Sequence, residues 1–213
     1  MSDNIKTVLC FGDSNTYGLK PDNSGRYPSD VRWSGILKSK LLNKNIEVIE
    51  EGLVGRTTVF EDSVRPGRKG LDYIGPLLES HGPVDKLILM LGTNDCKTLY
   101  KASPRVIGLG IERIIKSARA INQDIEILLI SPIHLGDDVW KEGFDPEFSR
   151  ESVEVSKKLK DEYREIARKY NCDFLAASDV AKPSGIDQEH LSEEGHRSLA
   201  EAVIRNFMDK TAV

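Results

Sequence analysis

The amino-acid sequence predicts an α/β fold, a three-layer α/β/α sandwich in which a five-stranded parallel sheet lies between two layers of helices. Short apolar segments alternate five times with segments of helical periodicity, which is typical of a parallel sheet covered on both faces. The third of them, Leu87-Ile88-Leu89-Met90-Leu91, is apolar throughout, as expected for a central strand. No change of composition divides the 213 residues, so we expect one domain over residues 1–213.

The predicted strands are short apolar runs bounded by turn-forming or polar residues. They span residues 7–11, 46–49, 84–91, 125–130 and 172–175. Parallel strands need crossover connections, and these are right-handed by default. The intervening segments are therefore expected to place helices on both faces of the sheet.

The predicted helices carry apolar residues at a spacing of about 3.6. They span residues 31–43, 71–80, 104 through at least 118, 151–170 and 192–208. Ser103 is the expected N-cap of the third helix, with Pro104 at its first position. Dense glycine and proline predict loops over residues 17–30, 60–70 and 134–148, and a connector over residues 177–185.

Composition excludes several classes of partner. The chain has 30 basic and 34 acidic residues, a formal net charge of −4, and no basic patch, so nucleic acid and membrane surfaces are not expected partners. The three cysteines are far apart and form no Cys-x-x-Cys pair, which favours reduced thiols and argues against structural zinc. With no secretory signal or spanning apolar run, we expect a cytoplasmic protein.

Polar residues gather where the predicted strands end. Ser14 follows the first strand, Gly55 the second and Asn94 the third, and Asp187 and His190 precede the last helix. The carboxyl ends of parallel strands emerge at one edge of a sheet, where open α/β sheets keep their ligand crevice. These residues can therefore meet in one site.

Their types suit acyl transfer. A serine hydroxyl such as Ser14 needs a base, and His190 can serve, with Asp187 one helical turn away to orient the ring. The backbone N–H groups of Ser14 and Gly55 and the side-chain amide of Asn94 are candidate donors to an oxyanion. Two alternatives stay open: Asp13 and Ser14 can simply cap the next helix, or residues 12–16 can hold a phosphate in a flavodoxin-like binding module.

Four segments resemble the sequence blocks of the SGNH hydrolases, also called the GDSL esterase/lipase family. They are Gly12-Asp13-Ser14, Gly55, Gly92-Thr93-Asn94-Asp95 and Asp187-x-x-His190, in the family's order. Asn15 stands where the name-giving motif has leucine, a position expected to tune packing. The second block lacks the asparagine of many members, which leaves Gly52 as an alternative to Gly55.

The resemblance implies a flavodoxin-like SGNH fold and a serine esterase that forms an acyl-enzyme on Ser14. Residues 30–33, 50–53, 56–58 and 90–95 are most similar to the bacterial arylesterase and acyltransferase branch. That branch implies small short-acyl or aryl esters as substrates, acyl transfer to alcohols, and a homo-oligomer. A carbohydrate O-acetyl esterase or a thioesterase is the alternative within the family. No metal or organic cofactor is implied.

Three residues near the predicted crevice are candidates for substrate binding: Asp13, Tyr17 and Trp33. Core packing is the alternative for the two aromatic residues. Asp95 is a competing acid but has no histidine near it in sequence. For Arg56 we expect a surface salt bridge.

Overall fold

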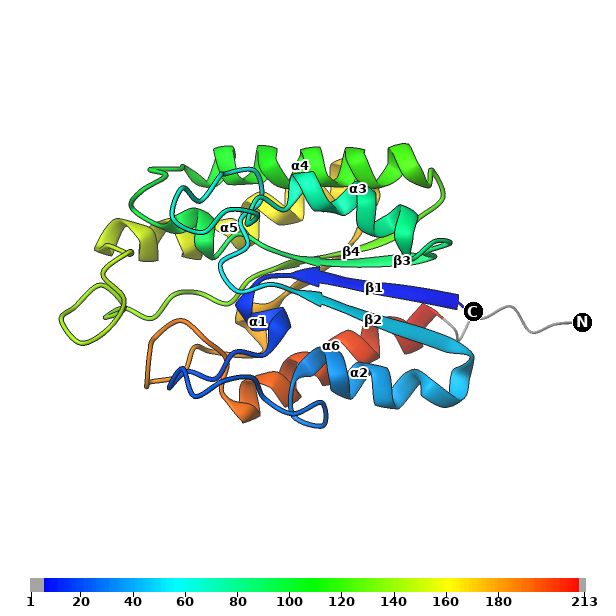
Figure 1. Cartoon of the computed structure of the whole chain (residues 1–213), viewed down its shortest axis with the longest axis horizontal. Helices are drawn as coiled ribbons and strands as arrows, with labels where there is room; N and C mark the ends of the chain where they lie inside the picture. Colours follow the sequence, from blue (N-terminus) through cyan, green and yellow to red (C-terminus); the bar gives the residue numbers. More distant parts are fainter. Residues whose placement is uncertain (1–5, 211–213) are drawn as a thin grey trace, which may run out of the picture.

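A computed structural model, which describes residues 6–210, shows five parallel strands in one sheet ordered β2-β1-β3-β4-β5 (Figure 1). The predicted α/β fold is thereby confirmed. The strands are β1 (Lys6–Gly12), β2 (Ile46–Gly52), β3 (Lys86–Met90), β4 (Glu126–Ser131) and β5 (Asp173–Ala176).

Helices cover both faces of the sheet (Figure 1). One face carries α3 (Leu71–Ser80), α4 (Pro104–Ile121) and α5 (Arg150–Lys169), and the other carries α2 (Trp33–Leu41) and α6 (Glu193–Lys210). Successive strand side chains point to opposite faces. Leu9 of β1 therefore packs in the core under α3, α4 and α5, whereas Val8 packs in the core with α2 and α6.

The strand register brings the carboxyl ends of the first three strands to one edge. Gly12, the last residue of β1, pairs with Gly52 of β2 and with Met90 of β3. The chain leaves this edge in short helical turns, α1 (Ser14–Tyr17) after β1 and η2 (Asn94–Cys96) beyond β3. Two further short turns are η1 (Leu42–Lys44) and η3 (Ala177–Asp179). Ser14 and Asn94 thus begin their turns at the same edge.

One strand is longer than predicted. β2 continues past residue 49 to Gly52 although Glu50 and Glu51 are charged. Arg32 donates from Nε and Nη2 to the carboxylate of Glu50 at 2.6 and 2.7 Å, so this acidic residue is paired inside the fold. The other predicted boundaries agree with the structure to within two residues.

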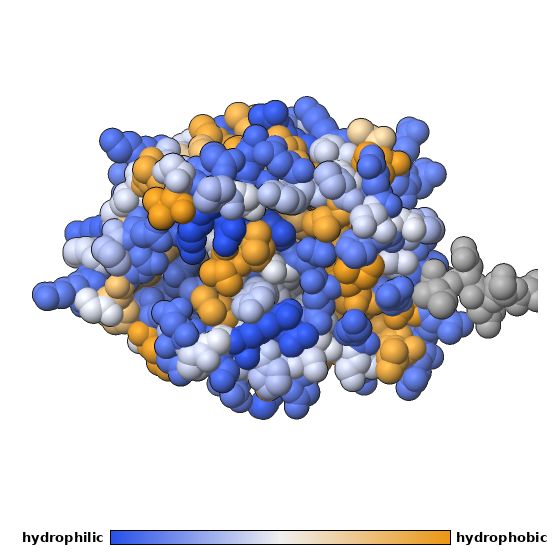
Figure 2. Space-filling view, viewed as in Figure 1, coloured by the Kyte–Doolittle hydropathy of each residue, from blue (hydrophilic) through white to orange (hydrophobic). Residues whose placement is uncertain are grey.

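Figure 2, drawn from the same side, shows hydrophilic residues over most of this face, with hydrophobic residues in smaller groups between them. Helices within residues 6–210 are too short or too polar to cross a lipid bilayer. All three cysteines are free thiols, and burial raises the pKa of Cys10 and of Cys96.

Candidate active site

Ser14 is the first residue of α1, a turn that follows β1 directly. Asp13 is the N-cap of this turn, and its carboxylate accepts the backbone N–H of Asn15 at 3.0 Å. Gly18 ends the turn in the left-handed conformation, with φ of 83°. The capping alternative is therefore correct for Asp13, while Ser14 stays available for other contacts.

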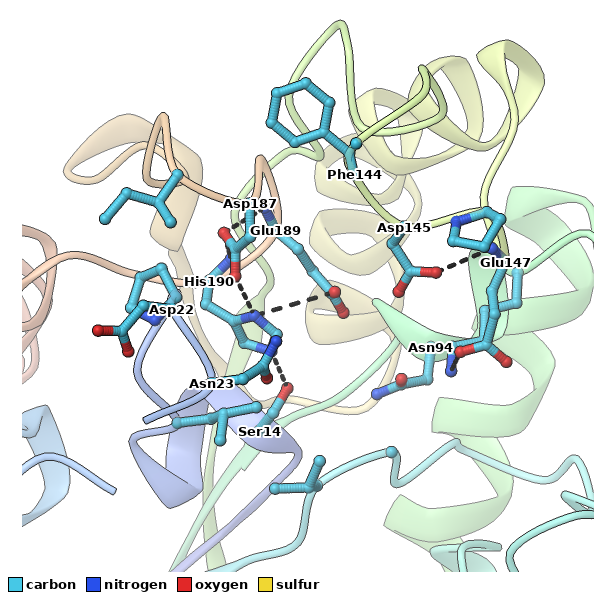
Figure 3. Close-up of a pocket in the computed structure, with 18 of the residues that line it drawn as sticks. Ser14, Asp22, Asn23, Asn94, Phe144, Asp145, Glu147, Asp187, Glu189 and His190 are labelled. Atoms are coloured by element: carbon cyan, nitrogen blue, oxygen red, sulfur yellow. Dashed lines mark hydrogen bonds and ion pairs between the residues drawn. The ribbon is translucent and has the colours of Figure 1, made fainter. Parts of the chain in front are cut away.

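The geometry joins Ser14 to His190 and Asp187 (Figure 3). Ser14 Oγ lies 2.8 Å from His190 Nε2, and His190 Nδ1 lies 2.6 Å from Asp187 Oδ2. Asp187 Oδ1 in turn accepts the backbone N–H of Glu189 and of His190, each at 3.0 Å. With a carboxylate at Nδ1, this nitrogen carries the proton and Nε2 is free to accept the Ser14 hydroxyl proton.

Electrostatics favours the charged form of this histidine. Burial lowers the pKa of His190, but the carboxylates of Glu189 and Asp187 outweigh burial, and the net pKa is raised. Burial raises the pKa of Asp187, yet its hydrogen bonds to His190 and to the backbone lower it overall. Asp187 therefore stays ionised and stabilises a proton on His190.

The predicted oxyanion donors line the same pocket as Ser14, a cavity of about 350 Å³. Gly55 has φ of 81°, a backbone conformation that favours glycine. Asn94 Nδ2 donates to the backbone oxygen of Arg56 at 3.1 Å, which fixes the orientation of its amide. Ser14, Gly55 and Asn94 are thus brought together.

Gly52 has another role. A Cβ at this position would lie 2.1 Å from the backbone nitrogen of Tyr17, so only glycine lets α1 pack against β2. Gly55 therefore lines the pocket, whereas Gly52 packs against α1 and is not part of the lining.

Arg56 is buried and does not form the surface salt bridge that the sequence predicts. The residue is only 4% exposed, and its guanidinium donates to the backbone oxygens of Gly12, at 2.9 Å, and Glu51. It also lies 4.2 Å from the ring centroid of Phe11. Burial lowers the pKa of Arg56 to about 10. This buried cation ties the ends of β1 and β2 together.

Asp95 does not contact His190. Its carboxylate accepts the backbone N–H of Thr58 at 3.0 Å and also the Thr58 hydroxyl. The residue is fully buried, and burial raises its pKa to about 7. Asp95 therefore joins the loop after β2 to the turn after β3, and the histidine's partner is Asp187.

The three predicted substrate-binding residues are not in the pocket lining. Asp13 is buried against α1, and burial raises its pKa to about 6. Trp33 is fully buried and donates from Nε1 to the backbone oxygen of Asn15 at 3.1 Å. Arg26 stacks on the ring of Tyr17, 4.5 Å from its centroid. All three support the turn that carries Ser14 instead of facing the pocket.

Sequence reasoning missed two residues of the site, Asn15 and Glu189. Asn15 Oδ1 accepts the backbone N–H of Leu191 at 2.9 Å, and its Nδ2 donates to the backbone oxygen of Glu189 at 3.4 Å. The departure of Asn15 from leucine was the signal that could have found it. Glu189 lines the pocket beside His190, and its position between Asp187 and His190 was the corresponding signal.

Comparisons with known proteins agree with this arrangement. Residues 10–198 match the GDSL-like Lipase/Acylhydrolase family, and the chain belongs to that family. The structure is similar to Est24, a carbohydrate acetylesterase from Sinorhizobium meliloti, with 33% identity over 96% of this chain and 99% of that one, and a TM-score of 0.87. It is also similar to the native aryl esterase of M. smegmatis, with 32% identity, the same coverages and a TM-score of 0.87. No curated protein matches the chain.

Proposed function

We propose that this protein is a serine ester hydrolase that cleaves small carboxylic esters through an acyl-enzyme on Ser14. The observation that carries the proposal is the continuous path from Ser14 Oγ through the His190 ring to Asp187, with atom separations of 2.8 and 2.6 Å. Family membership and the esterases among the similar structures support the same reaction.

The proposed reaction has two halves. Ser14 Oγ attacks the ester carbonyl carbon while His190 Nε2 takes the hydroxyl proton, and Asp187 stabilises the resulting imidazolium. As the tetrahedral intermediate collapses, the C–O bond to the alcohol breaks and His190 returns its proton to the leaving oxygen. Water then attacks the acyl-enzyme with His190 as base, and releases the carboxylic acid and Ser14. An alcohol in place of water would give acyl transfer.

The oxyanion of each tetrahedral intermediate would be stabilised by donors on the side of the pocket opposite His190. We assign this role to the backbone N–H groups of Ser14 and Gly55 and to the Asn94 amide. Losing one such donor typically costs about 3–4 kcal/mol of transition-state stabilisation. Because Asn94 is already oriented by the Arg56 carbonyl, its second N–H can serve without rearrangement.

A phosphate-binding module is disfavoured by the charges around the pocket. Five carboxylates line it against two cations, Lys97 and Arg65. Lys97 is paired with Glu147 at 2.6 Å, and Arg65 with Asp62 at 3.3 Å. An anion would therefore meet a surplus of negative charge, whereas a neutral ester would not.

The limited volume of the pocket favours short acyl groups. About 350 Å³ is near the lower end of the range for small-molecule sites, which runs from roughly 300 to 1,000 Å³. We expect acetyl esters to be cleaved faster than palmitoyl esters. The cytoplasmic location, the single domain and the homo-oligomer stay predictions, and sedimentation equilibrium checks the last of these.

The decisive experiment is hydrolysis of p-nitrophenyl acetate by the wild type and by Ser14→Ala. We expect the variant to lose all but background turnover, and a serine-directed phosphonate to label the wild type alone. Ser80→Ala is the matched control, because Ser80 is exposed at the end of α3. Equal turnover by the wild type and Ser14→Ala would refute the proposal.

A further inference from the structure

Glu189 presents a buried carboxylate to the pocket. The residue is 7% exposed, and within residues 6–210 its carboxylate accepts no hydrogen bond. Its one ionic contact within these residues joins Oε2 to His190 Nδ1 at 3.9 Å. That nitrogen is already hydrogen-bonded to Asp187. Figure 3 shows this carboxylate pointing into the pocket between His190 and Asp145. Apart from its 3.9 Å ionic contact with His190, this mostly buried carboxylate opens onto the pocket, so a ligand bound there is well placed to donate to it.

The protein itself offers few donors for this role. Lys97 also lines the pocket, but its ammonium binds Glu147 at 2.6 Å. The Asp145 carboxylate accepts the backbone N–H of Glu147 at 2.8 Å and has no proton of its own to give when ionised. A group of the substrate that enters the pocket can therefore supply this donor.

A neutral hydroxyl is the donor that fits best. Burial raises the pKa of Glu189 to about 7, and a hydroxyl can donate to the carboxylate and accept from the protonated acid. An ammonium group can pair only with the ionised carboxylate, because it cannot accept a hydrogen bond from the protonated acid. Quaternary ammonium groups are held by aromatic cages, whereas Phe144 is the single aromatic residue among the described residues that line the pocket.

The position of Glu189 assigns this hydroxyl to the alcohol part of the ester. In the proposed reaction the acyl oxygen faces Gly55 and Asn94, and the leaving oxygen faces His190, which protonates it. Glu189 precedes His190 in the same segment and points past its ring into the pocket (Figure 3). A hydroxyl close to the leaving oxygen would come within reach of Glu189.

We propose that Glu189 accepts a hydrogen bond from a free hydroxyl next to the ester group, so that the preferred substrates are partially acylated polyhydroxy alcohols. This rests on the proposed esterase function and narrows it. A site built to bind a hydroxyl rejects the analogue that lacks it, because its buried polar group is then left unpaired. Glu189 is thus the residue that selects the alcohol.

The test uses two acetate esters of equal size, 2-hydroxyethyl acetate and propyl acetate, in which a methyl group replaces the hydroxyl. For the wild type we expect kcat/KM to be at least roughly tenfold higher for the hydroxyl ester, as for hydrogen bonds to charged groups. In Glu189→Met this ratio should fall to about one, since both esters then meet an apolar side chain. Glu189→Gln, which keeps an acceptor oxygen, should retain part of the preference.

Glu193→Gln is the matched control, because it removes the same charge from an exposed residue at the start of α6 and should keep the wild-type ratio. A wild-type ratio near one, a ratio unchanged in Glu189→Met, or a preference for acetylcholine over both esters would overturn the proposal. Hydrolysis of p-nitrophenyl acetate, lost in Ser14→Ala, reports on the esterase function separately, since that substrate has no hydroxyl.

Discussion

The side chain of Asn15 holds the backbone of Leu191 across 176 residues of sequence, with its Oδ1 2.9 Å from the Leu191 nitrogen. The same amide donates to the backbone oxygen of Glu189 at 3.4 Å. These two bonds flank His190, so the residue after the proposed nucleophile positions the proposed base. Asn15 itself is 3% exposed, and Leu191 is fully buried.

Replacing Asn15 with leucine, the residue of the family's name-giving motif, should therefore impair the reaction. The variant leaves the Leu191 N–H buried without a partner, a loss of about 1–3 kcal/mol of stability. A displaced His190 should lower kcat by roughly 10- to 100-fold with little change in KM. Steady-state kinetics and thermal unfolding measure both effects.

Asn43→Leu is the control for this substitution, since Asn43 is exposed in η1. Asn15→Asp keeps the acceptor oxygen and should restore part of the lost kcat. Wild-type kcat in a folded Asn15→Leu protein would show that these hydrogen bonds do not position His190.

Asp187→Asn should reduce kcat far more than it changes the fold. An amide at this position donates toward His190 Nδ1 and favours the tautomer with the proton on Nε2, which cannot accept the Ser14 proton. In a well-studied serine protease the same change lowers kcat about 10⁴-fold. We expect a loss of roughly 10²- to 10⁴-fold for p-nitrophenyl acetate. Asp161→Asn on α5, where Asp161 is exposed, should leave kcat unchanged.

The acid limb of the pH–rate profile should depend on Glu189. The base must be neutral, so activity falls as pH drops through the pKa of His190, which Glu189 and Asp187 hold above its ordinary value. Glu189→Gln removes one of these negative charges. The limb should then move to lower pH, as measured by kcat/KM against pH. A limb that stays in place or moves to higher pH would contradict this assignment.

The folded state should lose stability as pH rises from about 4 to about 7 because of Asp95. Its pKa is raised from 3.8 to about 7, so the folded chain binds this proton more tightly than the unfolded chain, and ionisation destabilises the fold. Asp95→Asn keeps an acceptor for Thr58. Between pH 4 and pH 7 the free energy of unfolding of this variant should fall less than that of the wild type, by on the order of 3–4 kcal/mol. Urea unfolding at pH 4 and pH 7 measures it, with Asp161→Asn as control.

Gly52→Ala tests the packing of α1 against β2. The added Cβ would clash with the Tyr17 backbone and displace the turn that carries Ser14, at a cost of about 1–3 kcal/mol. Activity should fall with stability. Gly185→Ala is the matched control, because a Cβ there meets no atom within 4 Å. Equal melting temperatures for the two variants would argue against this role.

The strands and helices could be predicted because their apolar periodicity follows from burial on one or both faces. The extension of β2 to Gly52 could not, since it depends on Arg32 pairing with Glu50 from another element. Arg56 shows the same limit: a lone arginine looks solvated in sequence, and only the fold reveals two backbone oxygens and the Phe11 ring around it.

Within the site, the sequence predicts the proposed catalytic residues better than the residues that support them. Ser14, Asp187 and His190 have side-chain types that the chemistry demands, and their order along the chain is informative. The segments of Trp33 and Tyr17 lie near the crevice and so predict pocket residues, but the Trp33 ring contacts the backbone of α1 and the Tyr17 ring packs against Arg26. Asn15 and Glu189 depend on contacts between distant segments that no local pattern reveals.

The wide separation of Ser14 and His190 along the chain has a consequence for synthesis. A growing polypeptide makes its proposed nucleophile 176 residues before its proposed base, and it has no base until translation has passed residue 190 and that segment has emerged from the ribosome. Ester cleavage on stalled ribosomes would therefore report when the C-terminal segment docks onto α1. In the living cell, a nascent chain would have no esterase activity until that segment has docked.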